Sequence, residues 1–298
     1  MTAPFSGRGN VGIFFHRRVE ESRNLGAALV AALGDQGANA RLLDAWEPRE
    51  LLAGRLTGLD WAAVLGGDGT MLRIVGLLAP MGIPVLGVNF GRLGFLTEIR
   101  PAEALDACSR VLAGEGRVED RLMLEASAAM DLQPALDASG ALRDGTPPLL
   151  AGMGAVAVND VFIGRGRVAH AVRLELVVDG RPLIRLTADG LVLASPTGSS
   201  AYSLSAGGPI VDPRMAAVVL TPVVPHPVPV RSLVLPAGAV VDVTVRSEEE
   251  AICSLDGQRH FRLPDGAAIR VAAHARPARF LRLGEPADFY HTMVQRLG

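Results

Sequence analysis

The chain has 298 residues, with 49% hydrophobic and 20% charged positions and a formal net charge of −2. This composition predicts one large or two ordinary globular domains, and it argues against global disorder and a broad nucleic-acid surface. All 29 Lys+Arg positions are arginine, which excludes Walker A loops, lysine Schiff bases and kinases that need a catalytic lysine. We expect a cytoplasmic protein without membrane partners, because residues 1–10 carry no apolar leader and no apolar run is long enough to cross a bilayer.

Strand-like and helix-like patterns alternate through the first third of the chain. The apolar runs predicted to form buried strands are 11–15, 40–43, 61–65 and 83–88. The helical patterns lie around 25–34, from 71 to Pro80 and from Pro101 to Gly114. Such alternation is typical of a parallel sheet covered by helices, so we expect an α/β, Rossmann-like domain over residues 1–116.

The second half has the two-residue alternation of β-strands, as at 172–178 and 241–245. Asp179-Gly180 and Asp256-Gly257 are typical hairpin turns. We therefore expect a mainly-β, sandwich-like domain over residues 117–275.

Three segments depart from this pattern. The polar stretch 131–148 predicts a mobile hairpin loop, and the four prolines of 222–229 argue against a central strand there. Residues 276–298 form a C-terminal segment that can return to the first domain, with a short helix expected over 289–297.

The pentapeptide Gly66-Gly67-Asp68-Gly69-Thr70 separates the strand at 61–65 from the following helix. Glycines at such a turn let backbone amides approach a phosphate, and the helix N-terminus adds partial positive charge. Asp68 puts a carboxylate in the same loop, where a divalent metal could bridge it to phosphate or where it could face a substrate hydroxyl. Either arrangement indicates phosphoryl transfer, although Thr70 could serve only as the helix N-cap.

Polar residues also follow other predicted strands. The stretch 87–97 combines glycines with Asn89, Arg92 and two phenylalanines, so Arg92 could hold phosphate and an aromatic ring could support a flat base. Asn159-Asp160 interrupts a β run, and could form a bulge or supply acceptors for ribose hydroxyls.

A hydroxyl-rich and glycine-rich loop follows the strand that contains Asp189. It includes Tyr202, which is scarce because the chain has only two tyrosines. Such a loop indicates a tight polar surface for a sugar-phosphate ligand. Arg165 and Arg167 could clamp phosphate, but solvated surface arginines are the simpler interpretation.

Taken together, these motifs resemble the NAD kinase family, which shares GGDGT with diacylglycerol kinase-like enzymes. The motifs that carry the resemblance are GGDGT at 66–70, LGFLTE at 93–98, Asn159-Asp160, ADG at 188–190, SPTGSSAYSLSAGGPIVDP at 195–213 and PH at 225–226. The resemblance implies phosphate transfer from ATP, or from polyphosphate in some members, to the adenosine 2′-hydroxyl of NAD. It also implies Mg²⁺ or another divalent cation and a homo-oligomer, either a dimer or a tetramer.

The resemblance assigns roles to individual residues. Asp68 takes the catalytic role, Asn159 and Asp160 bind the adenosine ribose, Asp189 lies on the nicotinamide side, and Phe95 lies near the adenine. The loop residues that line the adenine and its neighbouring ribose are Thr197, Ser200, Ala201, Tyr202 and Ser205. The amides expected to hold donor phosphates are those of Gly66, Gly67, Gly69 and Thr70, and no side chain is expected to ligate a metal directly.

The chain departs from the family pattern at two positions. Asp160 stands where glutamate is usual, which shortens the acid by one methylene, and Ser200 replaces the usual threonine. Two other functions stay open. A lipid kinase would share GGDGT but would not explain the Tyr202 loop, and a non-catalytic dinucleotide sensor would not need Asp68.

Overall fold

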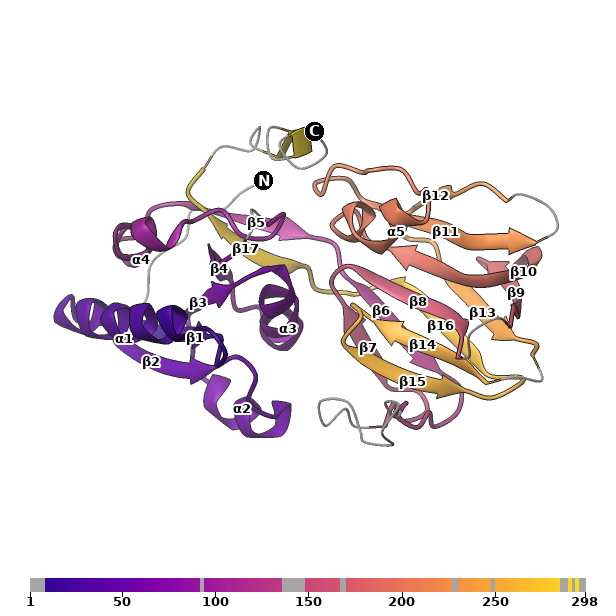
Figure 1. The fold of residues 1–298 in the computed structure, drawn as a ribbon, viewed down its shortest axis with the longest axis horizontal. Helices are drawn as coiled ribbons and strands as arrows, with labels where there is room; N and C mark the ends of the chain where they lie inside the picture. The colour runs from indigo at the N-terminus through magenta and orange to yellow at the C-terminus, as the bar shows by residue number, and fades with distance from the viewer. Residues whose placement is uncertain are drawn as a thin grey trace. The chain divides into compact units, whose positions relative to one another are not determined.

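The computed structural model describes residues 9–91, 94–135, 148–166, 170–226, 230–247, 250–284, 289–290 and 293–294. The chain divides into two compact units, drawn as ribbons in Figure 1: Met1–Arg121 with Arg276–Gly298, and Leu122–Ala275. None of the helices in these described ranges is long and apolar enough to cross a membrane.

The first unit contains a sheet with the order β2-β1-β3-β4-β17-β5. Its strands are β1 (Asn10–Phe15), β2 (Asn39–Asp44), β3 (Trp61–Gly66), β4 (Val85–Asn89), β5 (Arg117–Arg121) and β17 (Ala278–Arg282). Its helices are α1 (Glu20–Asp35), α2 (Arg49–Leu56), α3 (Asp68–Leu78) and α4 (Ala104–Leu112), with short 3-10 turns η1 (Ala79–Met81) and η2 (Pro101–Glu103). All pairs are parallel except β17 with β5, which confirms the predicted α/β class.

The predicted strands of this unit are all present, with shifts at their ends. The last begins at Val85 rather than Ile83, because Pro84 has no N–H to donate to a neighbouring strand. Helix α2 was not predicted, since only Leu52 and Leu56 of its eight residues are buried and its apolar periodicity is weak.

The C-terminal part of the chain completes the first sheet. Strand β17 pairs along its whole length with β5, and Phe280 pairs with Val85 of β4. In Figure 1 this yellow strand lies among indigo and magenta ones. The domain bounds expected from the sequence stay predictions, but the units divide after Arg121 because β5 belongs to this sheet.

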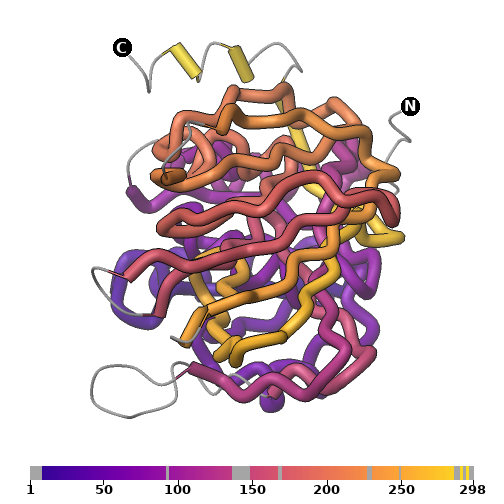
Figure 2. Tube along the Cα trace, turned by 90° about the vertical axis from the view of Figure 1, so that its right-hand side faces the viewer, coloured from indigo at the N-terminus to yellow at the C-terminus, as the bar shows by residue number. Residues whose placement is uncertain are grey.

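The second unit is antiparallel throughout its described strands, as the mainly-β prediction required, and Figure 2 looks onto it. Its strands are β6 (Leu124–Ala128), β7 (Gly154–Ala157), β8 (Asp160–Arg165), β9 (Val172–Val178), β10 (Arg181–Ala194), β11 (Ala217–His226), β12 (Leu233–Pro236), β13 (Val241–Val245), β14 (Ala251–Leu255), β15 (Arg259–Leu263) and β16 (Ala268–Ala273). Two short helices, η4 (Gly198–Ser200) and α5 (Tyr202–Ser205), follow β10.

The long strand β10 changes partner along its length. Its first part, Arg181–Ala188, pairs with β9, whereas Gly190–Ala194 pairs with β8. The sheet therefore divides into an arm β8-β14-β15 and an arm β9-β13-β16-β6-β7. Buried side chains of both arms, such as Cys253 and Val243, form one core, which gives the sandwich-like character.

The irregular segments are described in part. Leu132 pairs with Leu149 at the base of the predicted hairpin loop, and residues 136–147 lie outside the described ranges. Pro222 and Pro225 belong to β11, but that part of β11 pairs only with β10, because β12 pairs with Ala217–Leu220. Pro222 and Pro225 thus lie on an edge, which agrees with the prediction that no central strand forms there. Of the predicted C-terminal helix, residues 289–290 and 293–294 are described and helical.

Candidate functional site

The glycine loop joins strand β3 to helix α3. Gly67 is the helix N-cap, and its carbonyl accepts hydrogen bonds from the amides of Thr70 and Met71, each at 3.0 Å. Thr70 therefore lies inside the first helical turn rather than at the N-cap, and it is only 3% exposed. A Cβ on Gly66 would lie 2.7 Å from the Thr70 Cβ, so glycine lets the strand end this close to the helix.

The carboxylate of Asp68 is held by the backbone of the segment that follows β4. The amide of Phe95 donates to its Oδ2 at 3.0 Å and the amide of Leu96 donates to its Oδ1 at 3.2 Å. A Cβ on Gly94 would lie 2.0 Å from Oδ1, so this approach requires glycine. The carbonyl of Leu96 in turn accepts a hydrogen bond from Arg282 Nη1 at 3.2 Å. The GGDGT turn and residues 94–96 thus form one structural element.

A buried charge cluster on β5 and β17 supports this element. Arg121 Nε donates to Glu119 Oε1 at 2.6 Å, and Arg282 Nε lies 3.6 Å from the same oxygen. Burial favours a raised pKa for Glu119, but Arg121, Arg282 and a hydrogen bond from Arg117 outweigh it and lower the pKa to about 2. Burial, and then repulsion by Arg282, lowers the pKa of Arg121 to about 10. Arg282 is thereby fixed next to the loop that holds Asp68.

A basic turn at the end of β1 lies beside the glycine loop. Phe15 pairs with Leu65 in parallel register, so His16-Arg17-Arg18 follows β1 where Gly66 follows Leu65. Ser22 Oγ donates to the Leu65 carbonyl at 2.9 Å and accepts from the His16 amide at 3.0 Å, which ties the two turns together. Ligands of open α/β sheets bind at such carboxyl ends, at the point where strand order reverses. The sequence analysis did not single out this turn, although a basic run directly after a strand was visible.

Of three residues expected near phosphate or adenine, the structure describes only Phe95. Arg92 and Arg167 lie outside the described residues. Phe95 contributes its amide to Asp68, and its ring lies 6.3 Å from the ring of Phe289, centroid to centroid.

In the second unit, one carboxylate organises the Asn159-Asp160 pair at the start of β8. Asp256 Oδ1 accepts hydrogen bonds from the amides of Asn159 and Asp160 at 2.7 and 3.1 Å, and Oδ2 accepts from the Val158 amide at 2.9 Å. The Asp256 amide donates back to the Asp160 carbonyl at 3.0 Å. The sequence analysis identified Asp256 only as a turn residue, because this contact joins distant strands.

Asp160 and Asp256 both have pKa values above the ordinary range of an aspartate. Burial, and then the nearby charge of Asp256, raises the pKa of Asp160 to about 7. Burial also raises the pKa of Asp256, against the opposing effect of its three backbone donors. Asp160 therefore changes its charge close to neutral pH.

The hydroxyl-rich loop after β10 packs directly on the backbone of this turn. Ser195 Oγ donates to the Val158 carbonyl at 2.6 Å and accepts from the Gly198 amide at 3.1 Å, while the Ser195 amide donates to the Asn159 carbonyl at 2.8 Å. A Cβ on Gly198 would lie 2.0 Å from the Asn159 carbonyl oxygen, so glycine permits the contact. The loop and the Asn159-Asp160 pair are thus brought together, as the proposed ribose site requires.

These elements surround a pocket of about 320 Å³ within the second unit. The pocket is lined by Asn159, Asp160, Phe162, Ala201, Tyr202, Ser254, Asp256 and Gly257. Four of these residues were predicted, whereas the two strand residues Phe162 and Ser254 and the Asp256-Gly257 turn were not. The Phe162 and Tyr202 rings lie 5.4 Å apart, which gives this polar pocket one aromatic side.

Two buried oxygens of the site have no hydrogen-bond partner among the described residues: Asn159 Oδ1 and Thr197 Oγ1. A buried acceptor without a partner costs free energy, so these oxygens are suited to a ligand that brings donors. Both belong to residues predicted to bind nucleotide.

The other predicted residues lie outside the pocket lining. Ser200 Oγ donates to the Thr197 carbonyl at 3.3 Å, and the Ser205 amide donates to the Ala201 carbonyl at 3.4 Å. Asp189 lies where β10 changes partner, and its carboxylate is 3.1 Å from Arg165 Nη2. Arg165 therefore forms an ion pair, and its side chain is still 34% exposed.

Asp189 also acts on the pocket through its charge. Burial, and then the charges of Asp189 and Asp160, raise the pKa of the Tyr202 hydroxyl. Asp189 is thus electrostatically coupled to the residues that line the pocket.

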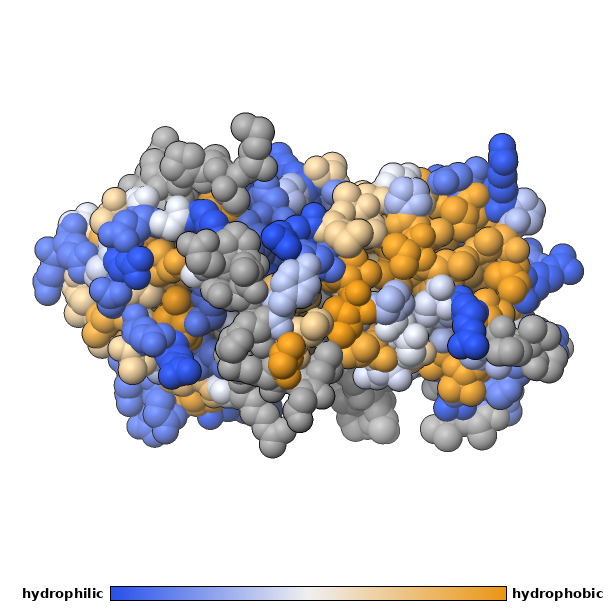
Figure 3. All heavy atoms as spheres, turned by 90° about the horizontal axis from the view of Figure 1, so that it is seen from above, coloured by the Kyte–Doolittle hydropathy of each residue, from blue (hydrophilic) through white to orange (hydrophobic). Residues whose placement is uncertain are grey.

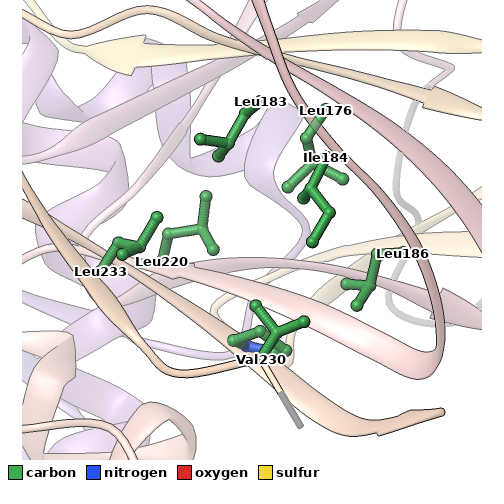
Figure 4. Close-up of a pocket in the computed structure, with 8 residues that line it drawn as sticks. Leu176, Leu183, Ile184, Leu186, Leu220, Val230 and Leu233 are labelled. Carbon is green, nitrogen blue, oxygen red and sulfur yellow. The ribbon is translucent and has the colours of Figure 1, made fainter. Parts of the chain in front are cut away.

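A second cavity of this unit, about 100 Å³ in volume, has a different character. Figure 4 shows its lining side chains, which come from β9, β10, β11 and β12 and include Leu176, Leu186, Leu220 and Leu233. This lining is apolar, so the cavity is unsuited to a nucleotide.

The described residues contain no group of three His, Cys, Asp or Glu side chains placed to hold a metal ion. Mg²⁺ commonly keeps several waters and binds through one or two carboxylates and substrate phosphates.

Comparison with known proteins covers both units. Two family models match: the ATP-NAD kinase N-terminal domain over residues 11–116 and the ATP-NAD kinase C-terminal domain over residues 158–283. An NAD kinase of Heliobacterium modesticaldum is 42% identical over 243 residues, which cover 81% of this chain and 80% of that protein. An NAD kinase of Dehalococcoides mccartyi is 31% identical over 287 residues, which cover 96% of this chain and 95% of that protein.

Solved structures give the same result for the fold. A yeast NADH kinase complexed with NADH has a TM-score of 0.81 at 26% identity, covering 99% of this chain and 88% of that chain. An NAD kinase from Archaeoglobus fulgidus in complex with ATP has a TM-score of 0.73 at 24% identity, covering 96% of this chain and 99% of that chain. With both of its units matched by family models and with relatives of this identity, the chain belongs to the NAD kinase family of enzymes.

Proposed function

We propose that this enzyme transfers the terminal phosphate of ATP, or of polyphosphate, to the adenosine 2′-hydroxyl of NAD, with Asp68 as the catalytic residue. The observation that carries the proposal is the Asp68 carboxylate at the start of α3, oriented by the amides of Phe95 and Leu96. The bound molecules of two similar proteins, NADH in the yeast enzyme and ATP in the archaeal one, support the choice of substrates.

Asp68 would accept the proton of the 2′-hydroxyl as its oxygen attacks the terminal phosphorus. The new bond joins that oxygen to phosphorus, and the bond from phosphorus to the leaving phosphate oxygen breaks. A positioned base typically contributes roughly 10²–10⁴-fold to the rate. The two backbone donors keep the carboxylate in one orientation, so little rearrangement is needed when the substrate binds.

The donor phosphates would lie against the amides of Gly66, Gly67, Gly69 and Thr70. The partial positive charge at the start of α3 and Arg18 in the neighbouring turn favour an anion there, whereas Arg17 is paired with Asp44 at 2.9 Å. Mg²⁺, bound to phosphate oxygens, would supply further charge neutralisation during transfer.

The acceptor nucleotide would occupy the polar pocket of the second unit. Asn159 and Asp160 are suited to bind ribose hydroxyls, because Asn159 Oδ1 lacks a partner among the described residues and Asp160 carries a carboxyl group. The aromatic side formed by Phe162 and Tyr202 is suited to a flat ring. Asp189 and the Thr197–Ser205 loop would complete the nucleotide site around it.

We also propose a cytoplasmic homo-oligomer, either a dimer or a tetramer. Leu183 and Leu233, which line the apolar cavity, are 42% and 37% exposed, and the neighbouring Val234 is 53% exposed. Figure 3 shows apolar side chains gathered over much of the face that the second unit presents in that view. Self-association of this face would remove those side chains from water.

The test is a coupled assay for NADP⁺ formation with ATP and polyphosphate supplied in turn, each with and without Mg²⁺. We expect NADP⁺ with at least one donor. Phosphorylation of diacylglycerol without NADP⁺ would instead indicate a lipid kinase, and tight NAD binding without product would indicate a sensor.

A further inference from the structure

We propose that Asp256 is a positioning residue for nucleotide recognition, whose carboxylate shapes the 158–160 turn so that Asn159 and Asp160 present their side chains to the ligand. This inference rests on the proposed function, because it assigns a supporting residue to the same nucleotide pocket. It concerns the hairpin turn between β14 and β15, which carries no role in the reaction described above.

Asp256 holds the 158–160 turn through several hydrogen bonds to its backbone. Three consecutive amides, those of Val158, Asn159 and Asp160, donate to the two oxygens of one carboxylate at 2.9, 2.7 and 3.1 Å. The Asp256 amide donates to the Asp160 carbonyl at 3.0 Å, so the turn is held in both directions. Asp256 also lines the pocket together with the two residues whose backbone it binds.

Turn formation alone does not explain this carboxylate. Asp179-Gly180 forms the same kind of Asp-Gly hairpin turn, with φ of 49° and 76°, and Asp256-Gly257 has φ of 54° and 65°. Asp179 Oδ1 accepts one hydrogen bond, from the Val240 amide of a neighbouring turn at 2.9 Å. Asparagine is equally suited to the left-handed conformation of these turns. The hairpin turn itself therefore does not need an aspartate. The three amides of Val158, Asn159 and Asp160 do need it, because they donate to both oxygens of the side chain and asparagine has only one.

The charge of Asp256 also acts on Asp160. Burial and Asp256 together raise the pKa of Asp160 to about 7. The other charged or titratable groups around this pair are Tyr202 beside Asp160, Arg259 beside Asp256, and the Asp189–Arg165 ion pair beyond Tyr202. Beside burial, Asp256 rather than any of these groups is the negative neighbour that raises the pKa of Asp160.

The test compares Asp256→Asn with the matched control Asp179→Asn. In Asp256→Asn the amide NH₂ faces at least one backbone N–H, so the 158–160 turn loses part of its support. Because the turn loses hydrogen bonds to a charged group, we expect the Kd for NAD to rise roughly tenfold or more in Asp256→Asn. The KM for ATP should stay unchanged in both variants, and Asp179→Asn should bind NAD as the unchanged protein does.

The pH dependence of NAD affinity separates positioning from a purely structural role. Calorimetry from pH 5 to pH 9 should show that the affinity of the unchanged protein for NAD changes as Asp160 loses its proton, with a midpoint of about 7. This measurement needs no variant. The midpoint should move to lower pH in Asp256→Asn because the neighbouring negative charge is gone.

Two results would overturn the inference: a flat profile in the unchanged protein, or an Asp256→Asn variant with the same Kd and midpoint. NADP⁺ formation by the unchanged protein tests the proposed function separately. Normal NADP⁺ formation together with either of those results would reject the role of Asp256 and leave the kinase function intact.

Discussion

At the scale of single residues, the environment of Asp68 decides what its carboxylate can do. Two backbone amides fix both oxygens, and a third group, the Leu96 carbonyl bound to Arg282, fixes the segment that supplies one of those amides. A carboxylate held in this way is oriented before the substrate arrives.

The first prediction concerns the role of this carboxylate. Asp68→Asn preserves the size of the side chain and removes the base, so the kcat for NADP⁺ formation should fall roughly 10²–10⁴-fold. The Kd for NAD should change little, because the ribose site belongs to other residues. Asp106→Asn, at an exposed position on α4, is the control and should be fully active. An Asp68→Asn enzyme with the unchanged kcat would contradict the assignment.

The second prediction concerns Asp160, whose pKa is raised by burial and by Asp256 to about 7. The unfolded chain binds this proton only below the ordinary aspartate pKa of about 4. The folded protein is therefore penalised as pH rises from about 4 to about 7, by up to about 4 kcal/mol, and the penalty persists at higher pH.

Asp160→Asn removes this penalty, so it should raise the melting temperature at pH 8 and leave it nearly unchanged at pH 4. The same variant should bind NAD more weakly, because it replaces the carboxylate that we propose binds the ribose. Thermal denaturation of both proteins at the two pH values checks the sign. An equal difference in melting temperature at pH 4 and pH 8 would count against the raised pKa.

At the scale of elements, the site depends on places where backbone segments approach closely. Gly94 lies against the Asp68 carboxylate, Gly66 against Thr70, and Gly198 against the Asn159 carbonyl. The first two approaches involve the start of α3, and the third joins a loop to the residue before β8, so each lies at the edge of a sheet. The glycines of the motifs are needed for this contact rather than for flexibility.

The third prediction follows from this close approach. A methyl group at Gly94 would lie 2.0 Å from Asp68 Oδ1, so Gly94→Ala must displace the carboxylate or the loop. We expect kcat to fall by about two orders of magnitude, as a misplaced catalytic group does, with a loss of stability of about 1–3 kcal/mol. The control is Gly76→Ala in α3, where an added Cβ meets nothing within 4 Å. This control should be active and slightly more stable, since alanine favours a helix. Full activity of Gly94→Ala would show that the contact is dispensable.

At the scale of the whole molecule, the chain is organised by segments that are distant in sequence. Strand β17, near the C-terminus, enters the first sheet between β4 and β5 and brings Arg282 to the Asp68 loop. The second unit presents the apolar cavity of Figure 4, with exposed Leu183 and Leu233 at its surface. We expect this face to be covered by a second copy of the chain.

The fourth prediction tests that assembly. Light scattering should give the mass of a dimer or tetramer for the unchanged protein, and a smaller mass for Leu233→Asp, because a buried charge opposes association. Leu51→Asp is the control, since Leu51 is 60% exposed on α2 of the first unit, and it should not change the mass. A monomeric unchanged protein would refute the proposed oligomer.

The sequence predicted the described site in large part because its signals are local. The GGDGT turn and Asn159-Asp160 adjoin the predicted strand ends, and the hydroxyl-rich loop follows β10 directly. Helix α2 was missed because it buries only two residues, and the His16-Arg17-Arg18 turn was missed because its place beside Gly66 depends on strand pairing. Phe162 was overlooked because it resembles any core aromatic until its contact with Tyr202 is known.

What the sequence by itself determined was the two fold classes, the GGDGT turn between a strand and a helix, and the family, since periodicity, turn chemistry and motif spacing are all carried by neighbouring residues. Only the tertiary structure decided that Asp256 binds the 158–160 turn, that Arg282 reaches the Leu96 carbonyl, and that Asp189 lies where β10 changes partner. The physical reason is that each of these contacts satisfies a polar group on one strand or loop with a partner on another. Such pairs are chosen by the packing of the folded chain, and no local pattern records them.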